Sequence, residues 1–134
     1  MAKQIFVNLP VKDLQRSIAF FTHLGFAFNP QFSDDNATCM IVSDDIFVML
    51  LVEPYFQTFT SRPVCDARKQ SEVLIALSAD SASDVDAMVG KAVAAGGAAP
   101  RPAQDHGFMY QHGFEDPDGH IWEVMHMDPS AAVS

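Results

Sequence analysis

Cysteine, basic residues and long apolar runs are all scarce in this chain of 134 residues. Cys39 and Cys65 are its only cysteines and cannot form a disulfide framework, so an apolar core must hold the fold. The longest apolar run, residues 46–52, is too short to cross a bilayer. Only 8 Lys and Arg stand against 17 Asp and Glu, and the formal net charge of −9 argues against nucleic acid or a membrane as partner. Met1 begins a segment without an apolar leader, so we expect a soluble, cytoplasmic protein.

The residues that are abundant indicate a single folded domain, because hydrophobic residues make up 49% of the chain and include 11 Phe and 7 Met. Residues 4–11 alternate like a strand. A helix is expected from Asp13, a good N-terminal cap, to Gly25, a good stop. Residues 26–32, 37–43 and 46–52 then predict three further strands separated by Asp- and Asn-rich turns.

The same order of elements recurs after a segment, residues 53–70, that is rich in proline and aromatic residues. Residues 72–79 predict a strand, and Ser83 or Asp84 can cap a helix that ends at Gly96. Residues 98–101, 108–115 and 120–126 predict the last strands. The fold class is therefore α+β with tandem βαβββ modules: module one spans about 4–53, the linker about 54–70 and module two about 71–127.

The last two strands are joined by a tight turn, Asp116-Pro117-Asp118-Gly119, which combines a fixed φ, two turn-forming Asp side chains and a flexible glycine. Side chains alternate on the strand that leaves the turn, so Glu123 shares one face with apolar neighbours. The hairpin therefore places one carboxylate on an otherwise apolar surface.

Two motifs resemble the vicinal oxygen chelate superfamily, which includes glyoxalase I, fosfomycin- and bleomycin-resistance proteins and extradiol dioxygenases. They are residues 11–21 (VKDLQRSIAFF) and the hairpin 113–124 (GFEDPDGHIWEV), and the resemblance covers about residues 4–127. It implies that the paired modules form a curved mixed sheet around a cup, the glyoxalase/bleomycin-resistance/dioxygenase fold. It also implies a small-molecule ligand and a homodimer.

The metal-dependent relatives bind a divalent ion with four side chains, whose positions fall here on Phe6, Leu50, Leu74 and Glu123. Only Glu123 can ligate a metal, and a catalytic site normally keeps three protein ligands. We therefore expect no metal or other cofactor. The alternative is a divalent metal relocated to Glu123 together with Glu72 or a histidine, and the chain offers His23, His106, His112, His120 and His126.

Strand parity, combined with the arrangement in the relatives, predicts which side chains line the cup. It is expected to be mostly apolar with a few polar points, as small-molecule pockets are. The predicted substrate-binding residues are Phe6, Asn8, Leu50, Glu72, Leu74, Gln111, Glu123 and Met125.

Three functions fit this pattern. The first is a protein like the bleomycin-resistance type, which binds a small organic molecule in an apolar cup without chemistry or metal. The second is a metal-dependent enzyme, a glyoxalase I-like lyase or a dioxygenase, with a relocated metal. The third is a metal-free isomerase or lyase in which Glu123 is the catalytic residue, as a general base acting on a proton beside a carbonyl.

Overall fold

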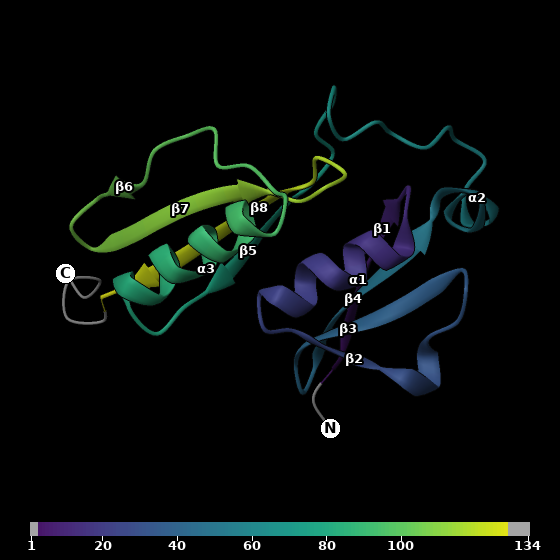
Figure 1. The fold of residues 1–134 in the computed structure, drawn as a ribbon, viewed down its shortest axis with the longest axis horizontal. Helices are drawn as coiled ribbons and strands as arrows, with labels where there is room; N and C mark the ends of the chain where they lie inside the picture. The colour runs from purple at the N-terminus through teal and green to yellow at the C-terminus, as the bar shows by residue number, and fades with distance from the viewer. Residues whose placement is uncertain (1–2, 129–134) are drawn as a thin grey trace. The chain divides into compact units, whose positions relative to one another are not determined.

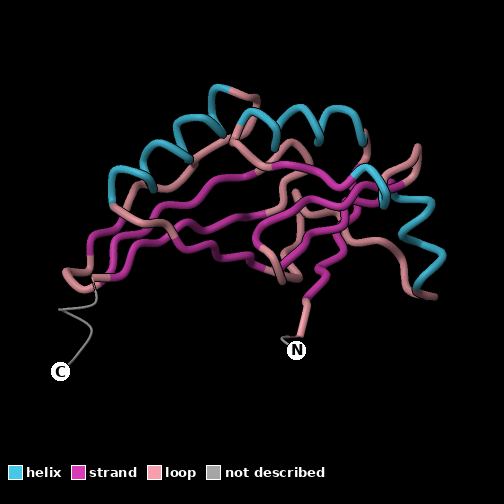
Figure 2. The backbone as a smooth tube through the Cα atoms, turned by 90° about the horizontal axis from the view of Figure 1, so that it is seen from below, coloured by secondary structure: helices cyan, strands magenta, loops and turns pink. Residues whose placement is uncertain are grey.

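A computed structural model describes residues 3–128 and divides the chain between Cys65 and Asp66 into two units (Figure 1). Each unit is a βαβββ module with a four-stranded mixed sheet, as the sequence predicts. In each module the longest helix lies along one face of its own sheet (Figure 2). Among residues 3–128, no helix is long and apolar enough to cross a membrane.

Module one contains one parallel and two antiparallel strand pairs in the order β1-β4-β3-β2. Asp13 caps the helix as predicted, because its side chain accepts a hydrogen bond from the Arg16 backbone N–H (3.1 Å). Gly25 follows the helix with φ +105°, a conformation that glycine adopts most easily. The bounds are β1 Ile5–Val11, α1 Leu14–His23, β2 Ala27–Asn29, β3 Ala37–Ser43 and β4 Ile46–Val52.

The predicted strand 26–32 is only partly a strand. β2 ends at Asn29, and η1 (Pro30–Phe32) is a 3-10 helix that begins where the Asn29 side chain accepts from the Gln31 N–H (3.0 Å). Pro30 favours this helix start because its φ is already helical and it needs no hydrogen-bond acceptor.

The register of β1 against β4 corrects the predicted face of Leu50. Phe6 pairs with Phe47, and their rings stack with centroids 4.9 Å apart. Leu50 pairs instead with Leu9, one of the residues on the opposite face, and is fully buried with it. Leu50 therefore does not share a face with Phe6 and Asn8, and the parity assigned to β4 was wrong.

Beyond β4 the linker is partly helical, with α2 at Glu53–Phe56 and the 3-10 helix η2 at Gln57–Phe59. Tyr55 and Phe59 contact each other edge to face, with ring centroids 5.2 Å apart. The rest of this segment belongs to neither sheet until β5 begins at Leu74.

Module two repeats the arrangement in the order β5-β8-β7-β6. Its helix begins earlier than predicted, because Ser81 rather than Ser83 or Asp84 is the cap and its hydroxyl accepts from the Asp84 N–H (3.0 Å). The bounds are β5 Leu74–Ser78, α3 Ala82–Ala94, β6 Gln104–Asp105, β7 Met109–Glu115 and β8 Ile121–Met127.

The predicted strand 98–101 is also wrong. Ala98 makes an isolated bridge to Glu115, and the chain rejoins β7 only at Gln104, which pairs with Gln111. Between these contacts the segment bulges away from the ladder. Pro100 and Pro102 explain the bulge, since neither residue has a backbone N–H with which to continue the ladder.

The turn before β8 is buried and fully hydrogen-bonded. One Asp116 carboxylate oxygen accepts from the N–H groups of Asp118 and His120 (3.0 Å each), and the other accepts from Trp122 Nε1 (3.0 Å). Burial raises the pKa of Asp116, although the positive charge of His120 and the bond from Trp122 oppose the shift. The turn thereby fixes Trp122 toward the buried layer, and alternation places Glu123 on the other face.

Arg68, near the start of the second unit, closes over this turn. Its guanidinium donates to the Pro117 carbonyl. Gly119 has φ +90°, and a Cβ added there would lie 3.1 Å from the Arg68 backbone nitrogen and 2.7 Å from its Cγ. Both the backbone conformation and the close approach therefore require glycine at this position.

Candidate functional site

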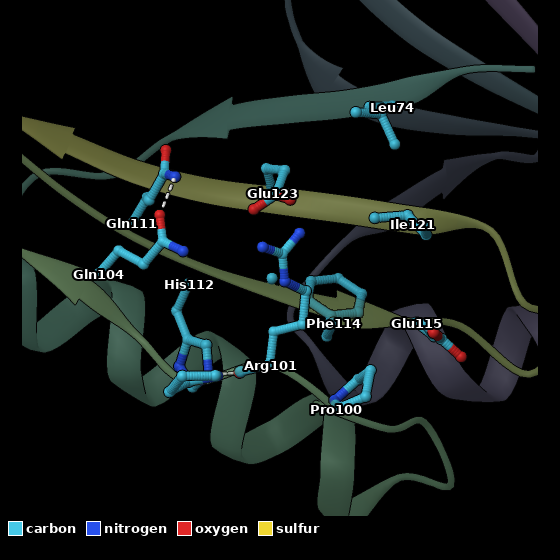
Figure 3. Close-up of a pocket in the computed structure, with 12 residues that line it drawn as sticks. Leu74, Pro100, Arg101, Gln104, Gln111, His112, Phe114, Glu115, Ile121 and Glu123 are labelled. Carbon is cyan, nitrogen blue, oxygen red and sulfur yellow. Dashed lines mark hydrogen bonds between the residues drawn. The ribbon is translucent and has the colours of Figure 1, made fainter. Parts of the chain in front are cut away.

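A pocket of about 300 Å³ opens on the sheet face of module two that α3 does not cover. All of its lining residues belong to this module (Figure 3). β7 and β8 form its floor, β5 contributes Leu74, and the bulged segment contributes Pro100 and Arg101. The volume is at the lower end of the range for small-molecule sites.

Glu123 lies in the floor of the pocket, directly over Gly113 of the neighbouring strand. The two residues are paired in the β7–β8 ladder, and a Cβ added to Gly113 would lie 3.0 Å from Glu123 Oε2 and 3.3 Å from Oε1. Within the described range the half-buried carboxylate has no hydrogen bond or ion pair, so its acceptor positions face the pocket.

Arg101 brings a positive charge to the same space. Its guanidinium points from the bulge toward Glu123 (Figure 3). The Nε2 of His112 donates to the Arg101 backbone carbonyl (3.0 Å) and so ties the bulge to β7. Across residues 3–128 the guanidinium has no ion pair. Opposite charges therefore face one pocket without neutralising each other directly.

Two side-chain amides form a second polar point. Gln111 Nε2 donates a hydrogen bond to Gln104 Oε1 (3.1 Å). The Gln104 NH₂ group can still donate hydrogen bonds to a ligand, and the Gln111 carbonyl oxygen can still accept them. The register of β6 against β7 pairs these residues, so the ladder itself sets their separation.

The remaining walls are mostly apolar, and Glu115 is the further charged residue among them. Leu74 is 60% exposed on β5, and Ile121 is its partner on β8. Trp122 and Phe114 point to the other face, where both are buried and their rings stack with centroids 6.2 Å apart. This rigid layer supports the floor, while the pocket presents apolar surface with a few convergent polar groups.

The structure brings together three of the predicted binding residues: Leu74, Gln111 and Glu123 all line the pocket. Met125 shares their face of β8 but is not among the lining residues. Glu72 precedes β5 and is exposed. Three further residues belong to module one: Phe6, Asn8 and Leu50. Whether any of these residues binds a ligand stays a prediction.

Sequence analysis missed Arg101 and Gln104. Arg101 ends the predicted strand 98–101, and Gln104 lies between that strand and the next one predicted, 108–115, although the structure places Gln104 in β6. The sequence Pro100-Arg101-Pro102 could have indicated this irregularity, because two prolines on either side of one residue are incompatible with a continuous hydrogen-bonded strand.

The donor atoms of this site do not fit the divalent metal of the metal-dependent relatives. Among residues 3–128, no group of three or more His, Cys, Asp or Glu side chains could hold a metal ion. Besides Glu123 the pocket lining holds one further carboxylate, Glu115, together with apolar side chains, amides and a guanidinium, and two carboxylates fall short of the three protein ligands that a catalytic site normally keeps. His112 is directed to the Arg101 carbonyl.

The paired four-stranded modules, with a small-molecule-sized pocket on one of them, define a glyoxalase-like fold. The chain belongs to the Glyoxalase/Bleomycin resistance protein/Dioxygenase superfamily, also called the vicinal oxygen chelate superfamily, whose family model matches residues 3–124. This confirms the family that the two sequence motifs indicated. Comparison with the curated proteins gives no match.

Solved structures agree with this assignment. A hypothetical protein from S. aureus is 29% identical, with a TM-score of 0.79, and the alignment covers 93% of this chain and 94% of that one. A glyoxalase-related enzyme from Fulvimarina pelagi is 23% identical, with a TM-score of 0.78 and coverages of 94% and 88%. An antibiotic binding protein from Streptomyces sp. CB03234 is 19% identical, with a TM-score of 0.67 and coverages of 96% and 98%. The last two likenesses show the fold alone.

Proposed function

We propose that this protein binds a small organic molecule in the pocket of module two, without a divalent metal and without chemistry. The observation that carries the proposal is the pair of opposite, unpaired charges, Glu123 and Arg101, in a pocket with apolar walls. A half-buried carboxylate that makes no internal hydrogen bond is costly unless water or a ligand binds it. The antibiotic binding protein from Streptomyces has the same fold, which is compatible with this use.

A ligand screen by thermal denaturation tests the proposal. A ligand that binds only the folded protein stabilises it by about 2.7 kcal/mol at a hundred times its dissociation constant. We expect Glu123→Gln to weaken binding of the hits. Asp35→Asn makes the same charge change at an exposed carboxylate of module one, outside the pocket lining, and is the matched control. If Glu123→Gln left the affinity of the hits unchanged, or if both variants lowered it equally, the binding site would lie elsewhere.

Elemental analysis tests the metal-free part. We expect protein incubated with Ni, Zn, Mn or Fe(II) and then desalted to retain far less than one equivalent, because residues 3–128 offer no group of three or more His, Cys, Asp or Glu side chains that could hold a metal ion. Retention of about one equivalent per chain would favour the glyoxalase I-like lyase or the dioxygenase instead. The homodimer and the cytoplasmic location also stay predictions, and sedimentation would test the first.

A second function is favoured by one feature of the same site. Glu123 has no internal partner within the described residues and faces a guanidinium, so it could remove a proton beside a carbonyl while Arg101 stabilises the resulting oxyanion. The protein would then be a metal-free isomerase or lyase. This predicts turnover that survives chelation and that Glu123→Gln lowers by orders of magnitude; unchanged turnover would exclude the role.

A further inference from the structure

We infer that the ligand of this pocket is an uncharged molecule whose polar group both accepts and donates hydrogen bonds, as a carboxamide, lactam or urea does. The inference rests on the proposed function and names the chemical class of its ligand. Arg101 would donate to the carbonyl oxygen of that group, and Glu123 would accept from its N–H.

The arrangement of charges carries this inference. Arg101 and Glu123 face one pocket but form no ion pair with each other. A third charged residue, Glu115, also lines the pocket, but its carboxylate points away from this pair (Figure 3). A guanidinium can only donate hydrogen bonds and an ionised carboxylate can only accept them. A polar group placed between the two must therefore present an acceptor on one side and a donor on the other.

A charged ligand fits this arrangement less well. An anion would be attracted to Arg101 but repelled by Glu123, and a cation would meet the opposite problem. In either case the two contributions largely cancel, while the ligand still loses the hydration of its charge. An amide loses less hydration and can satisfy both side chains.

The amide pair Gln104 and Gln111 likewise offers both a hydrogen-bond donor and an acceptor. The bond between Gln111 and Gln104 uses one donor and one acceptor, so the pair still offers a donor and an acceptor of its own (Figure 3). The pocket thus presents donors and acceptors together at two places. Its apolar walls, Leu74, Pro100 and Ile121, suit a ring or short aliphatic body beside the amide.

Three ligands of nearly equal shape test the inference: benzamide, benzoate and benzamidine, which carry a neutral, an anionic and a cationic group on one ring. A cavity of about 150 Å³ accepts benzene, so a pocket of about 300 Å³ has room for each of them. Binding is measured by NMR titration of ¹⁵N-labelled full-length protein. The backbone amide of Gly113 and the side-chain NH₂ groups of Gln104 and Gln111 report on the pocket.

We expect benzamide to bind at least tenfold more tightly than benzoate or benzamidine. Two variants then change the selectivity in opposite directions. Arg101→Met leaves Glu123 as the only charge of the pair and should favour benzamidine over benzamide, whereas Glu123→Gln leaves Arg101 and should favour benzoate. Asp35→Asn is the matched control and should leave the order unchanged, because Asp35 is exposed in module one and does not line the pocket. Amide spectra of the free variants confirm that each is folded.

Each outcome supports or contradicts the inference. Tightest binding of benzoate or benzamidine to the wild-type protein would overturn it, as would an order that neither variant alters. Those results would leave the proposed binding function intact, because the pocket would still be occupied. If none of the three ligands shifted the pocket signals at their solubility limits while the ligand screen gave Glu123-dependent hits, the amide class would be wrong and the binding function would stand.

Discussion

Replacement of Gly113 by alanine should separate binding from stability. Gly113 lies directly beneath Glu123, and its backbone does not have the positive φ that would exclude an alanine. The new methyl group would lie 3.0 Å from Glu123 Oε2, 3.2 Å from Cδ and 3.3 Å from Oε1, all closer than ordinary van der Waals contact. Because the contacted atoms are the end of a flexible side chain, the carboxylate should move by a few tenths of an ångström while the strands stay in place.

The two expected effects have different magnitudes. Replacing glycine by alanine in a permitted conformation stabilises a protein by about 0.4–1 kcal/mol, since the unfolded chain loses freedom. The displaced carboxylate offsets part of this gain, so we expect the melting temperature to stay the same or to rise by up to about 4 °C. Loss of a well-placed, charge-assisted hydrogen bond to a ligand costs about 1.5–3 kcal/mol, or roughly ten- to 150-fold in affinity.

Thermal denaturation and titration with the tightest ligand of the wild-type protein would measure both effects. Gly90→Ala is the control: Gly90 lies within α3, where an added Cβ would have no neighbour within 4 Å. It should raise stability by up to about 1 kcal/mol and leave affinity unchanged. Unchanged affinity in Gly113→Ala would show that Glu123 does not contact the ligand. A large fall in its melting temperature would show that Glu123 is held rigidly.

Three further substitutions test the framework around the pocket. Gly119→Ala should lower stability by about 2–4 kcal/mol in thermal denaturation, because φ is +90° and Arg68 occupies the space. Asp116→Asn should lower the free energy of unfolding by about 1–3 kcal/mol, since an amide NH₂ cannot accept from Trp122 Nε1. Because burial raises the pKa of Asp116 in the folded protein, ionisation of this carboxyl opposes folding. Urea titrations should therefore show that the stability advantage of the wild type over Asp116→Asn shrinks as the pH rises from about 4 through that pKa. Ser81→Ala should cost about 1 kcal/mol of unfolding free energy through loss of the α3 cap.

Sequence alone predicted most of the order of the elements, because the boundaries that were predicted correctly have local causes. Asp13 and Gly25 delimit α1 through capping and a left-handed backbone, and both interactions are local in the chain. The faces of β8 were predictable for the same reason, since the turn Asp116–Gly119 precedes the strand directly and the β7–β8 register confirms the alternation.

The face of Leu50 could not be obtained in that way. All seven residues of β4, Ile46–Val52, are apolar, so alternation along the strand carries no signal and parity was taken from the family resemblance. Its true face depends on pairing with β1, from which it is separated by about forty residues of chain. Arg101 was missed for a related reason. Its position in the pocket depends on a bulge relative to β7, and the register of pairing with β7 cannot be predicted from the residues next to Arg101 in the chain.

The bulge at Pro100-Arg101-Pro102 also bears on solubility. This segment runs along the outer edge of the module-two sheet, and exposed sheet edges can recruit strands from other chains. Prolines interrupt the row of backbone donors that such recruitment needs, and a charged residue between them discourages close approach. Changing both prolines to strand-forming residues would therefore do more than move Arg101: it would give the sheet a continuous free edge, and with it a route to aggregation.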